Sequence, residues 1–289
     1  EDIGELARAA AASGEPSDRI LLAPMPRDGS IPLSYPQTRL WFINRMDPTA
    51  ATYNMPGAMR IGPETEVDAL SAAVADVLVR HESLRTRFPA VDGEPVQQIL
   101  EGREIDSESI LRVVEVSAGE LASAISAEAT EGFDLIDQTP IRFTLLNVVD
   151  ETGATVDAVL VVVLHHIAGD GFSLRPLITD LLSAYHARSS GMAPDWEPLP
   201  VQYADFAMWQ RAVLGDPDDP SSPIATEIDF WAQELAGSPE VLTLPSDRPR
   251  PVVPSGLGAY VDTVLPADLA SGVRALASRL GVTTFTVFH

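Results

Sequence analysis

The chain has 289 residues and no cysteine, and its 19 basic residues, all of them arginine, stand against 42 acidic ones, giving a formal net charge of −23. The lack of cysteine excludes disulfides and thiolate chemistry, and the lack of lysine excludes Schiff-base enzymes and P-loop lysines. A surface this acidic repels phosphate backbones and anionic lipids. Neither nucleic acid nor a membrane is therefore expected as a partner. No apolar run of about eighteen residues and no signal-peptide pattern occurs, which favours a cytoplasmic protein.

The first thirty residues separate into a helical pattern and a linker. Residues 1–12 are alanine-rich and helical in pattern, and they end at Ser13-Gly14. Residues 13–30 carry prolines, glycines and scattered charge, a composition typical of linkers. Because so short a helix cannot fold alone, we expect residues 1–12 to be the last helix of a preceding domain.

Helical and extended patterns alternate from Ile31 to about residue 192. Apolar residues at helical spacing predict helices over 66–81, over 120–129 and from 174 to Gly191 at the latest, the last with Ser173 as its N-cap. Apolar runs predict strands over 84–91, 95–100, 110–116, 141–149 and 155–164. Asp92-Gly93 and Glu151-Thr152-Gly153 are expected to form the turns of two hairpins.

Two proline-rich breaks, at 194–200 and 245–254, divide the rest of the chain. Around them the sequence predicts a strand over 260–265 and helices over 203–214, 224–236 and 266–280. The apolar pattern is interrupted at His289. We therefore expect residues 193–289 to hold a crossover and the truncated beginning of a second subdomain.

The segment from His165 to Gly171 carries the strongest chemical pattern. It follows the apolar run 158–164 and places two adjacent imidazoles, an aspartate and a glycine at a strand-to-helix turn. These residue types are typical of an acid–base site. Because neighbouring strand residues face opposite sides, His165 and His166 cannot both enter one cleft, so one is expected to be structural and the other reactive.

Other interpretations of these two histidines are a core residue, a metal site and a serine hydrolase. A single histidine at a strand end is more often a satisfied core residue than a reactive one. A metal site is disfavoured, because neighbouring histidines on opposite faces chelate poorly and no Glu-x-x-His or His-x-x-x-His pattern is present. A serine hydrolase is disfavoured because the chain has no Gly-x-Ser-x-Gly elbow.

The aspartate of this segment is expected to form a structural salt bridge. Hairpin pairing about Glu151-Thr152-Gly153 joins positions whose numbers sum to roughly 305, which sets Arg142 opposite Val163 and near Asp170. A buried aspartate needs a partner, and arginine forms the best bidentate one. We predict an Asp170–Arg142 pair that fixes the turn, with Arg85 as the competing partner.

Residues 164–173 resemble the His-His-x-x-x-Asp-Gly signature of condensation domains in nonribosomal peptide synthetases. Three more stretches resemble other blocks of that family in the same order, at residues 34–41, 80–88 and 203–210. Four blocks in order make the resemblance specific. It implies an α/β fold, a two-layer α+β sandwich like chloramphenicol acetyltransferase, in which two such subdomains form a V around a tunnel.

The resemblance also implies an activity and partners. An upstream donor carrier domain and a downstream acceptor carrier domain each present a phosphopantetheine thioester, and the acceptor amine attacks the donor thioester. The domain itself binds no cofactor, since the carriers deliver the phosphopantetheine arms. An adjacent adenylation domain in one multidomain chain is expected, and residues 1–12 become the tail of an upstream carrier.

Roles for individual residues follow from the resemblance. His166 is expected to be the catalytic residue, as general base or by holding the attacking amine. Gly171 is expected to let its backbone approach the substrates. The remaining site residues are expected to be structural, with helix packing preferred for the tryptophan: His165, Asp170, Arg142, Arg85 and Trp209.

Related functions within and beyond this family are the alternatives. Epimerisation domains share the double histidine but carry tryptophan soon after the serine of the motif, where this chain has Leu174-Arg175-Pro176. Heterocyclisation domains replace the histidines with aspartates. A non-catalytic domain of the same fold that recruits partner enzymes, and a stand-alone acyltransferase using coenzyme A, are the rivals from other classes.

Overall fold

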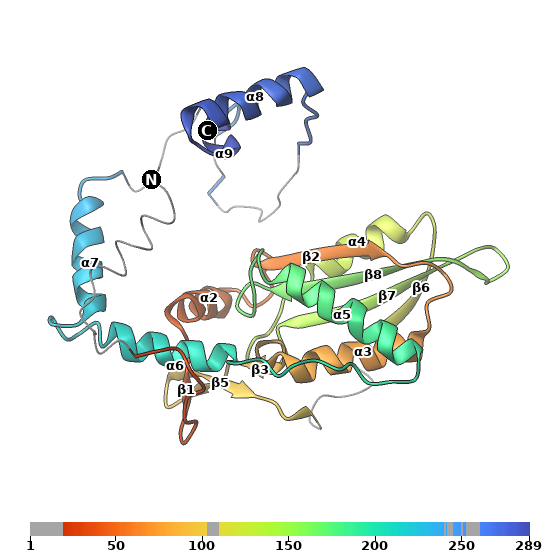
Figure 1. The fold of residues 1–289 in the computed structure, drawn as a ribbon, viewed down its shortest axis with the longest axis horizontal. Coiled ribbons are helices and arrows are strands. Elements are labelled where there is room, and N and C mark those ends of the chain that lie inside the picture. The colour runs from red at the N-terminus through yellow and green to blue at the C-terminus, as the bar shows by residue number, and fades with distance from the viewer. Residues whose placement is uncertain (1–19, 103–109, 240, 242–244, 250, 253–260) are drawn as a thin grey trace. The chain divides into compact units, whose positions relative to one another are not determined.

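A computed structural model describes residues 20–102, 110–239, 241, 245–249, 251–252 and 261–289 (Figure 1). The chain divides into two compact units, Glu1–Leu244 and Pro245–His289. This boundary differs from the one expected near residue 192, because helix α6 (Tyr203–Leu214) bonds to residues of the first unit, as described below. The carrier tail expected over residues 1–12 lies outside the described residues.

The first unit is built on a four-stranded sheet in the order β2-β8-β7-β6. Its strands are β2 (Asn54–Arg60), β6 (Arg112–Ser117), β7 (Ile141–Val149) and β8 (Thr155–His165). Strands β7 and β8 form the predicted hairpin, in which Arg142 lies opposite Val163 as expected. Strand β6 runs parallel to β7, and helix α4 (Leu121–Thr130) connects the two.

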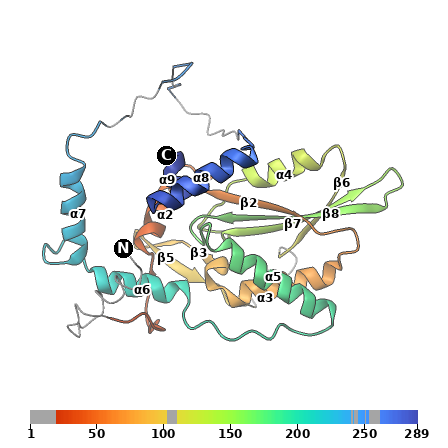
Figure 2. The same ribbon diagram turned by 45° about the horizontal axis from the view of Figure 1, so that its top comes forward.

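Helices α3 (Val67–Arg80) and α5 (Leu174–Ser189) lie side by side against one face of this sheet (Figures 1 and 2). Alternate residues of β7 and β8 face these helices, because side chains along a strand point to opposite faces. The resulting core contains Val74, Val77, Phe143, Leu145, Leu160, Leu164, Leu177 and Leu181, all buried.

The other face of the sheet is covered as well. Helices α4 and α2 (Tyr35–Met46) pack there around a second core that contains Leu33, Phe88, Phe133, Leu135, Leu146, Val161 and Val163. The predicted α/β class is confirmed, and the second covered face adds to the two-layer sandwich that the sequence predicts.

A smaller sheet joins β1 (Ile31–Pro32), β3 (Thr86–Arg87) and β4 (Ala90–Val91) to β5 (Glu94–Ile99). The predicted turn is confirmed, since Asp92 and Gly93 both have positive φ, 55° and 89°. The strand expected over 84–91 is broken into a 3₁₀ turn, η1 (Glu82–Arg85), and two short strands. Pro89 stands at the break, where it has no N–H to give to a ladder.

Helix α6 has the predicted bounds, and α7 (Pro223–Glu234) follows it. The second unit contains α8 (Ala267–Leu280), capped by Gly281 at φ 66°, and α9 (Thr284–Phe288). The strand predicted over 260–265 is wrong for residues 261–265, which pair with no described strand and leave Val261 92% exposed. None of the described helices is long and apolar enough to cross a membrane.

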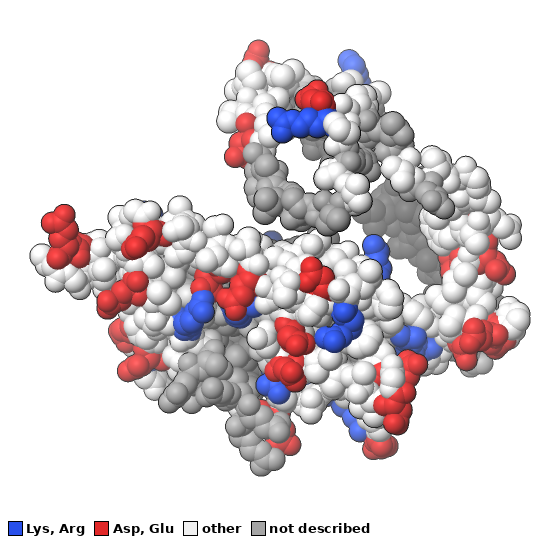
Figure 3. Space-filling view, turned by 180° about the vertical axis from the view of Figure 1, so that it is seen from behind, with Lys and Arg blue, Asp and Glu red and all other residues white. Residues whose placement is uncertain are grey.

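Charged side chains are spread over the surface. Figure 3 shows acidic groups scattered over the side of each unit that it presents, with arginines between them. On the sides shown, the arginines do not gather into a basic patch, and the excess of acidic side chains expected from the net charge is visible.

Candidate active site

His165 ends strand β8 and faces the core, where it is 2% exposed. Its Nδ1 accepts a hydrogen bond from the Ile167 N–H at 3.1 Å, and its ring lies edge-on to Phe133 with centroids 6.0 Å apart. Burial, with a smaller contribution from the neighbouring His166, lowers the pKa of His165 to about 4. The ring is therefore neutral near pH 7, with its proton on Nε2.

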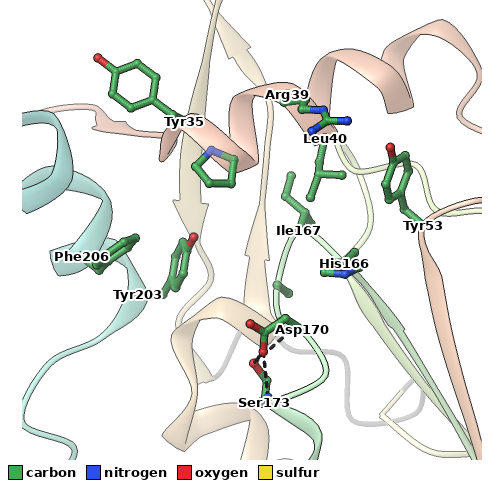
Figure 4. Close-up of a pocket in the computed structure, with 13 residues that line it drawn as sticks. Tyr35, Arg39, Leu40, Tyr53, His166, Ile167, Asp170, Ser173, Tyr203 and Phe206 are labelled. Carbon is green, nitrogen blue, oxygen red and sulfur yellow. Dashed lines mark hydrogen bonds between the residues drawn. The ribbon is translucent and has the colours of Figure 1, made fainter. Parts of the chain in front are cut away.

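His166 faces the opposite way and is exposed. Its backbone N–H donates to the Tyr53 carbonyl at 2.9 Å, which fixes the start of the turn to the residue before β2. The ring lines a cleft of about 750 Å³ (Figure 4), and no described residue hydrogen-bonds to it. The opposite orientations predicted for the two histidines are confirmed, and an unengaged imidazole is free to bind or accept a proton from a ligand.

Four parts of the first unit supply the cleft. Tyr35, Pro36, Arg39 and Leu40 come from α2, His166–Asp170 and Ser173 come from the turn after β8, and Tyr203 and Phe206 come from α6, with Tyr53 beside His166 (Figure 4). The Tyr203 hydroxyl lies 3.0 Å from Ser34 Oγ. Burial raises the pKa of Tyr203, so this phenol stays protonated near pH 7.

Asp170 does not form the predicted salt bridge. It is exposed, and its carboxylate accepts hydrogen bonds from the Ser173 N–H at 2.9 Å and the Ser173 hydroxyl at 2.7 Å. The Ser173 Oγ in turn accepts from the Asp170 N–H at 3.0 Å. These bonds lower the pKa of Asp170 and close the turn that leads into α5, as a reciprocal cap does. The turn carries the carboxylate into solvent, where it needs no arginine.

Arg142 binds a different segment. Its guanidinium donates to the Gly132 carbonyl at 3.0 Å and the Glu128 carbonyl at 3.3 Å, and it lies 3.9 Å above the Phe133 ring. Because Phe133 also packs on His165, Arg142 supports the buried histidine through that ring. The prediction that Arg142 pairs with Asp170 is thus wrong in its partner, although the residue lies on the strand where the register placed it.

The two other residues expected to be structural make local contacts. Arg85 donates to the Leu100 carbonyl and forms an ion pair with Glu82 at 3.7 Å, so it is not the partner of Asp170 either. The Trp209 indole donates to the Ile20 carbonyl at 2.6 Å, and its ring lies 5.7 Å from Phe206. The packing preferred for Trp209 thus includes a segment that the sequence assigned to a linker.

The two glycines of the turn have different surroundings. A Cβ on Gly169 would come within 2.9 Å of Leu164 Cδ2 and 3.1 Å of Ser173 Cβ. A Cβ on Gly171 would meet nothing within 4 Å, and its φ is not in the left-handed region. A side chain at 169 would therefore force Leu164 and Ser173 to shift, whereas a side chain at 171 would displace no described residue.

Some cleft residues were not singled out from the sequence. Tyr35, Arg39, Tyr203 and Phe206 belong to the first and fourth resemblance blocks, and only their membership of those blocks indicated a shared site. Tyr53 lies outside those two blocks, and the pairing of β2 with β8 brings it to the cleft. Among the described residues no group of three histidine or acidic side chains is placed to hold a metal ion.

Most of the chain matches one known family. The family model described as the condensation domain covers residues 27–289. The chain belongs to the condensation-domain family. Curated relatives are nonribosomal peptide synthetases, among them the probable non-canonical synthetase CymA of Salinispora arenicola (45% identical over 93% of this chain) and the isonitrile lipopeptide synthase of Mycobacterium tuberculosis (45% over 96%). The chain spans 3% and 11% of the length of these two proteins.

Solved structures of the same fold include domains with different names. The X-domain from teicoplanin biosynthesis aligns with a TM-score of 0.78 and 31% identity over 91% of this chain and 56% of that chain. The starter condensation domain of rhizomide synthetase aligns with a TM-score of 0.58 and 19% identity, over 74% of this chain and 49% of that one. The second likeness shows the fold alone.

Proposed function

We propose that this condensation domain joins a donor acyl or aminoacyl thioester on one carrier domain to the amine of an aminoacyl thioester on the next. The observation that carries the proposal is the exposed, unengaged ring of His166 in a cleft of about 750 Å³, directly after a histidine that is buried and neutral. The cleft is open enough for two substrates to meet beside one imidazole.

The reaction needs little from the protein beyond geometry. The acceptor amine attacks the thioester carbonyl carbon, a C–N bond forms, the C–S bond breaks, and the departing thiolate takes up the proton that the amine loses. The His166 ring lines the cleft, so it can take that proton from the amine and pass it to the thiolate. General-base help is worth about 10²–10⁴-fold, whereas positioning two tethered reactants can supply roughly 7–11 kcal/mol. His166 therefore assists a reaction that positioning dominates.

Gly171 has the second role in this proposal. It stands in the turn between His166 and α5, and a side chain there would project into space that no described residue fills. We assign this space to the phosphopantetheine arm or to the acyl group that it carries. The arms belong to the substrates and come from donor and acceptor carrier domains, with an adenylation domain expected beside them in the same assembly.

A recruitment role is the second candidate, and one observation favours it. The alignment to the teicoplanin X-domain has a higher TM-score, 0.78, than that to the rhizomide starter condensation domain, 0.58. The X-domain has also been solved in complex with a second protein, OxyB. In this alternative the domain binds a partner enzyme and the cleft transfers nothing.

Intact-protein mass spectrometry of the acceptor carrier distinguishes the two. The domain is used within its whole synthetase module, with donor and acceptor carriers loaded with aminoacyl groups. The proposal predicts that the acceptor gains the mass of the donor acyl group, more slowly with His166→Ala than with the control His186→Ala, an exposed histidine on α5. No gain with several donor pairs, together with stable binding of a partner enzyme, would establish recruitment.

A further inference from the structure

The segment Ile20–Arg27, called here the strap, lies along helix α6 (Figures 1 and 2). The Trp209 indole N–H donates to the Ile20 carbonyl at 2.6 Å. The Met25 N–H donates to Asp205 Oδ1 at 3.0 Å, and Arg27 Nη2 donates to the same oxygen at 3.2 Å. A stretch with linker-like composition is thus bonded to the helix at both of its ends.

Arg27 also bonds α6 to a second element. Its Nη1 lies 2.7 Å from Glu82 Oε2, on the 3₁₀ turn η1. Gln202, the residue before α6, also bonds the start of α6 to this turn. Its side chain donates to the Arg80 carbonyl at 2.9 Å and accepts from the Glu82 N–H at 3.2 Å. The guanidinium therefore closes a junction between the strap, the start of α6 and the 80–85 turn.

The Asp205 carboxylate links the bonds of the junction to one another, because it accepts several of them while buried. Only 2% of the residue is exposed. Burial alone would raise its pKa, but hydrogen bonds from the Gln202 and Met25 N–H groups and from Arg27 outweigh it and lower the pKa. Two of these three partners belong to the strap. Without them a buried charge would keep one backbone donor, and such a charge is costly to leave unpaired.

The strap and the cleft lie against adjoining faces of α6, where the Trp209 and Phe206 rings meet with centroids 5.7 Å apart. Asp205 and Trp209, four residues apart on one face, bind the strap. Tyr203 and Phe206 line the cleft, and Tyr203 also contacts Ser34. Helix α6 therefore contacts the strap and the cleft at once, and its position couples them.

We propose that Arg27 and Asp205 are positioning residues: docking of the strap holds α6 where Tyr203 and Phe206 complete the cleft around His166. The inference deepens the proposed function and rests on it where it concerns rate. The strap is also the stretch through which the chain enters β1, so the entrance to the domain and the candidate reaction cleft are joined through one helix.

Hydrogen exchange tests the coupling without any reference to activity. We compare wild type with Arg27→Gln, Arg27→Lys and a control, Arg45→Gln, which removes a surface ion pair of 3.7 Å to Asp134. Arg27→Gln should raise exchange of the Met25 amide and of the first turn of α6 by about 10-fold or more, because opening the junction exposes both. Arg27→Lys should restore part of the protection, and the control should match wild type.

Transfer kinetics in the whole synthetase module test the positioning role, well below the melting temperature of each variant. Arg27→Gln should lower kcat by about 10-fold or more and leave KM for the carriers unchanged, since it displaces cleft residues and not a docking surface. Arg27→Lys should recover part of kcat, and Arg45→Gln all of it, whereas a merely structural role would change the melting temperature alone.

The outcomes separate the two claims. A strap released in exchange with an unchanged kcat would overturn the positioning role, and so would a Met25 amide that stays protected in Arg27→Gln. If the wild-type module transfers nothing, the proposed function fails, and hydrogen exchange alone tests the coupling of strap and α6. In that case, an α6 that keeps its protection while the strap is released contradicts the coupling.

Discussion

The two histidines at the end of β8 lie in opposite environments, one in the core and one in the cleft. On the core side, His165 is 2% exposed, bonded to Ile167 and packed on Phe133. On the cleft side, His166 is exposed and no described residue hydrogen-bonds to its ring. Adjacent residues at the end of one strand thus acquire opposite properties, because successive side chains point to opposite sides. Substitutions on the core side should change stability, and substitutions on the cleft side should change transfer.

The largest expected effect is on the cleft side. His166→Ala should slow carrier-to-carrier transfer by about 10²–10⁴-fold, because it removes general-base assistance. The free energy of unfolding should change by no more than about 0.5 kcal/mol, since an exposed side chain without partners is removed. Urea unfolding and transfer assays on the same preparation check both. A loss of stability as large as that from a core substitution would remove the distinction between the two sides.

His165 should make stability depend on pH. The unfolded ring takes a proton below about pH 6.5, while the buried ring resists protonation until its lowered pKa of about 4. Stability from this group is therefore complete above pH 6.5 and is lost as pH falls toward 4, by about 3 kcal/mol in all.

His165→Asn tests this prediction. Its amide oxygen can still accept from the Ile167 N–H, but it does not titrate in this range. Urea unfolding of both proteins from pH 7 to pH 4 should show a difference that shrinks as the pH falls. A constant difference would mean that His165 is not held neutral by burial.

The two glycines of the turn give a matched pair. Gly169→Ala should destabilise the protein by about 1–3 kcal/mol, because the new methyl meets Leu164 and Ser173. Gly171→Ala should unfold like wild type and transfer more slowly, because its methyl enters space assigned to the substrate. Equal stability of the two variants would contradict the surroundings described for Gly169, and full transfer by Gly171→Ala would remove the role proposed for Gly171.

The smallest effect is expected at Asp170. Asp170→Ala removes the acceptor that closes the turn before α5 and should cost about 1 kcal/mol, and Asp170→Asn should cost less because it keeps an acceptor for the Ser173 N–H. Thermal or urea unfolding of both variants measures this. A loss of about 3–5 kcal/mol would instead indicate a buried ion pair of the kind first predicted.

The sequence predicts well where local patterning decides the structure. The register of β7 on β8 follows from the turn at 151–153, and the bounds of α6 follow from its helical spacing. Strand β2 was missed because Pro56 and Gly57 interrupt it, and a proline is tolerated there because β2 is an edge strand. Helix α2 was missed although its Ser34-x-x-Gln37 capping box is visible in the sequence.

The errors at the site come from burial, which the sequence does not show. Asp170 was paired with an arginine on the assumption that it is buried, and the turn carries it into solvent. The strap was interpreted as a linker because its composition is polar and proline-rich. Its bonds to Trp209 and Asp205 join residues more than 175 positions apart, beyond any local pattern.

The most direct test of the division between the two histidines is a single-turnover transfer measured in the whole synthetase module. The donor carrier is loaded, and the mass of the acceptor carrier is followed with wild type, His166→Ala and the control His186→Ala. We expect full mass gain in all three at long times, with His166→Ala slower by about 10²–10⁴-fold and His186→Ala equal to wild type. Transfer by His166→Ala at the wild-type rate would contradict this expectation.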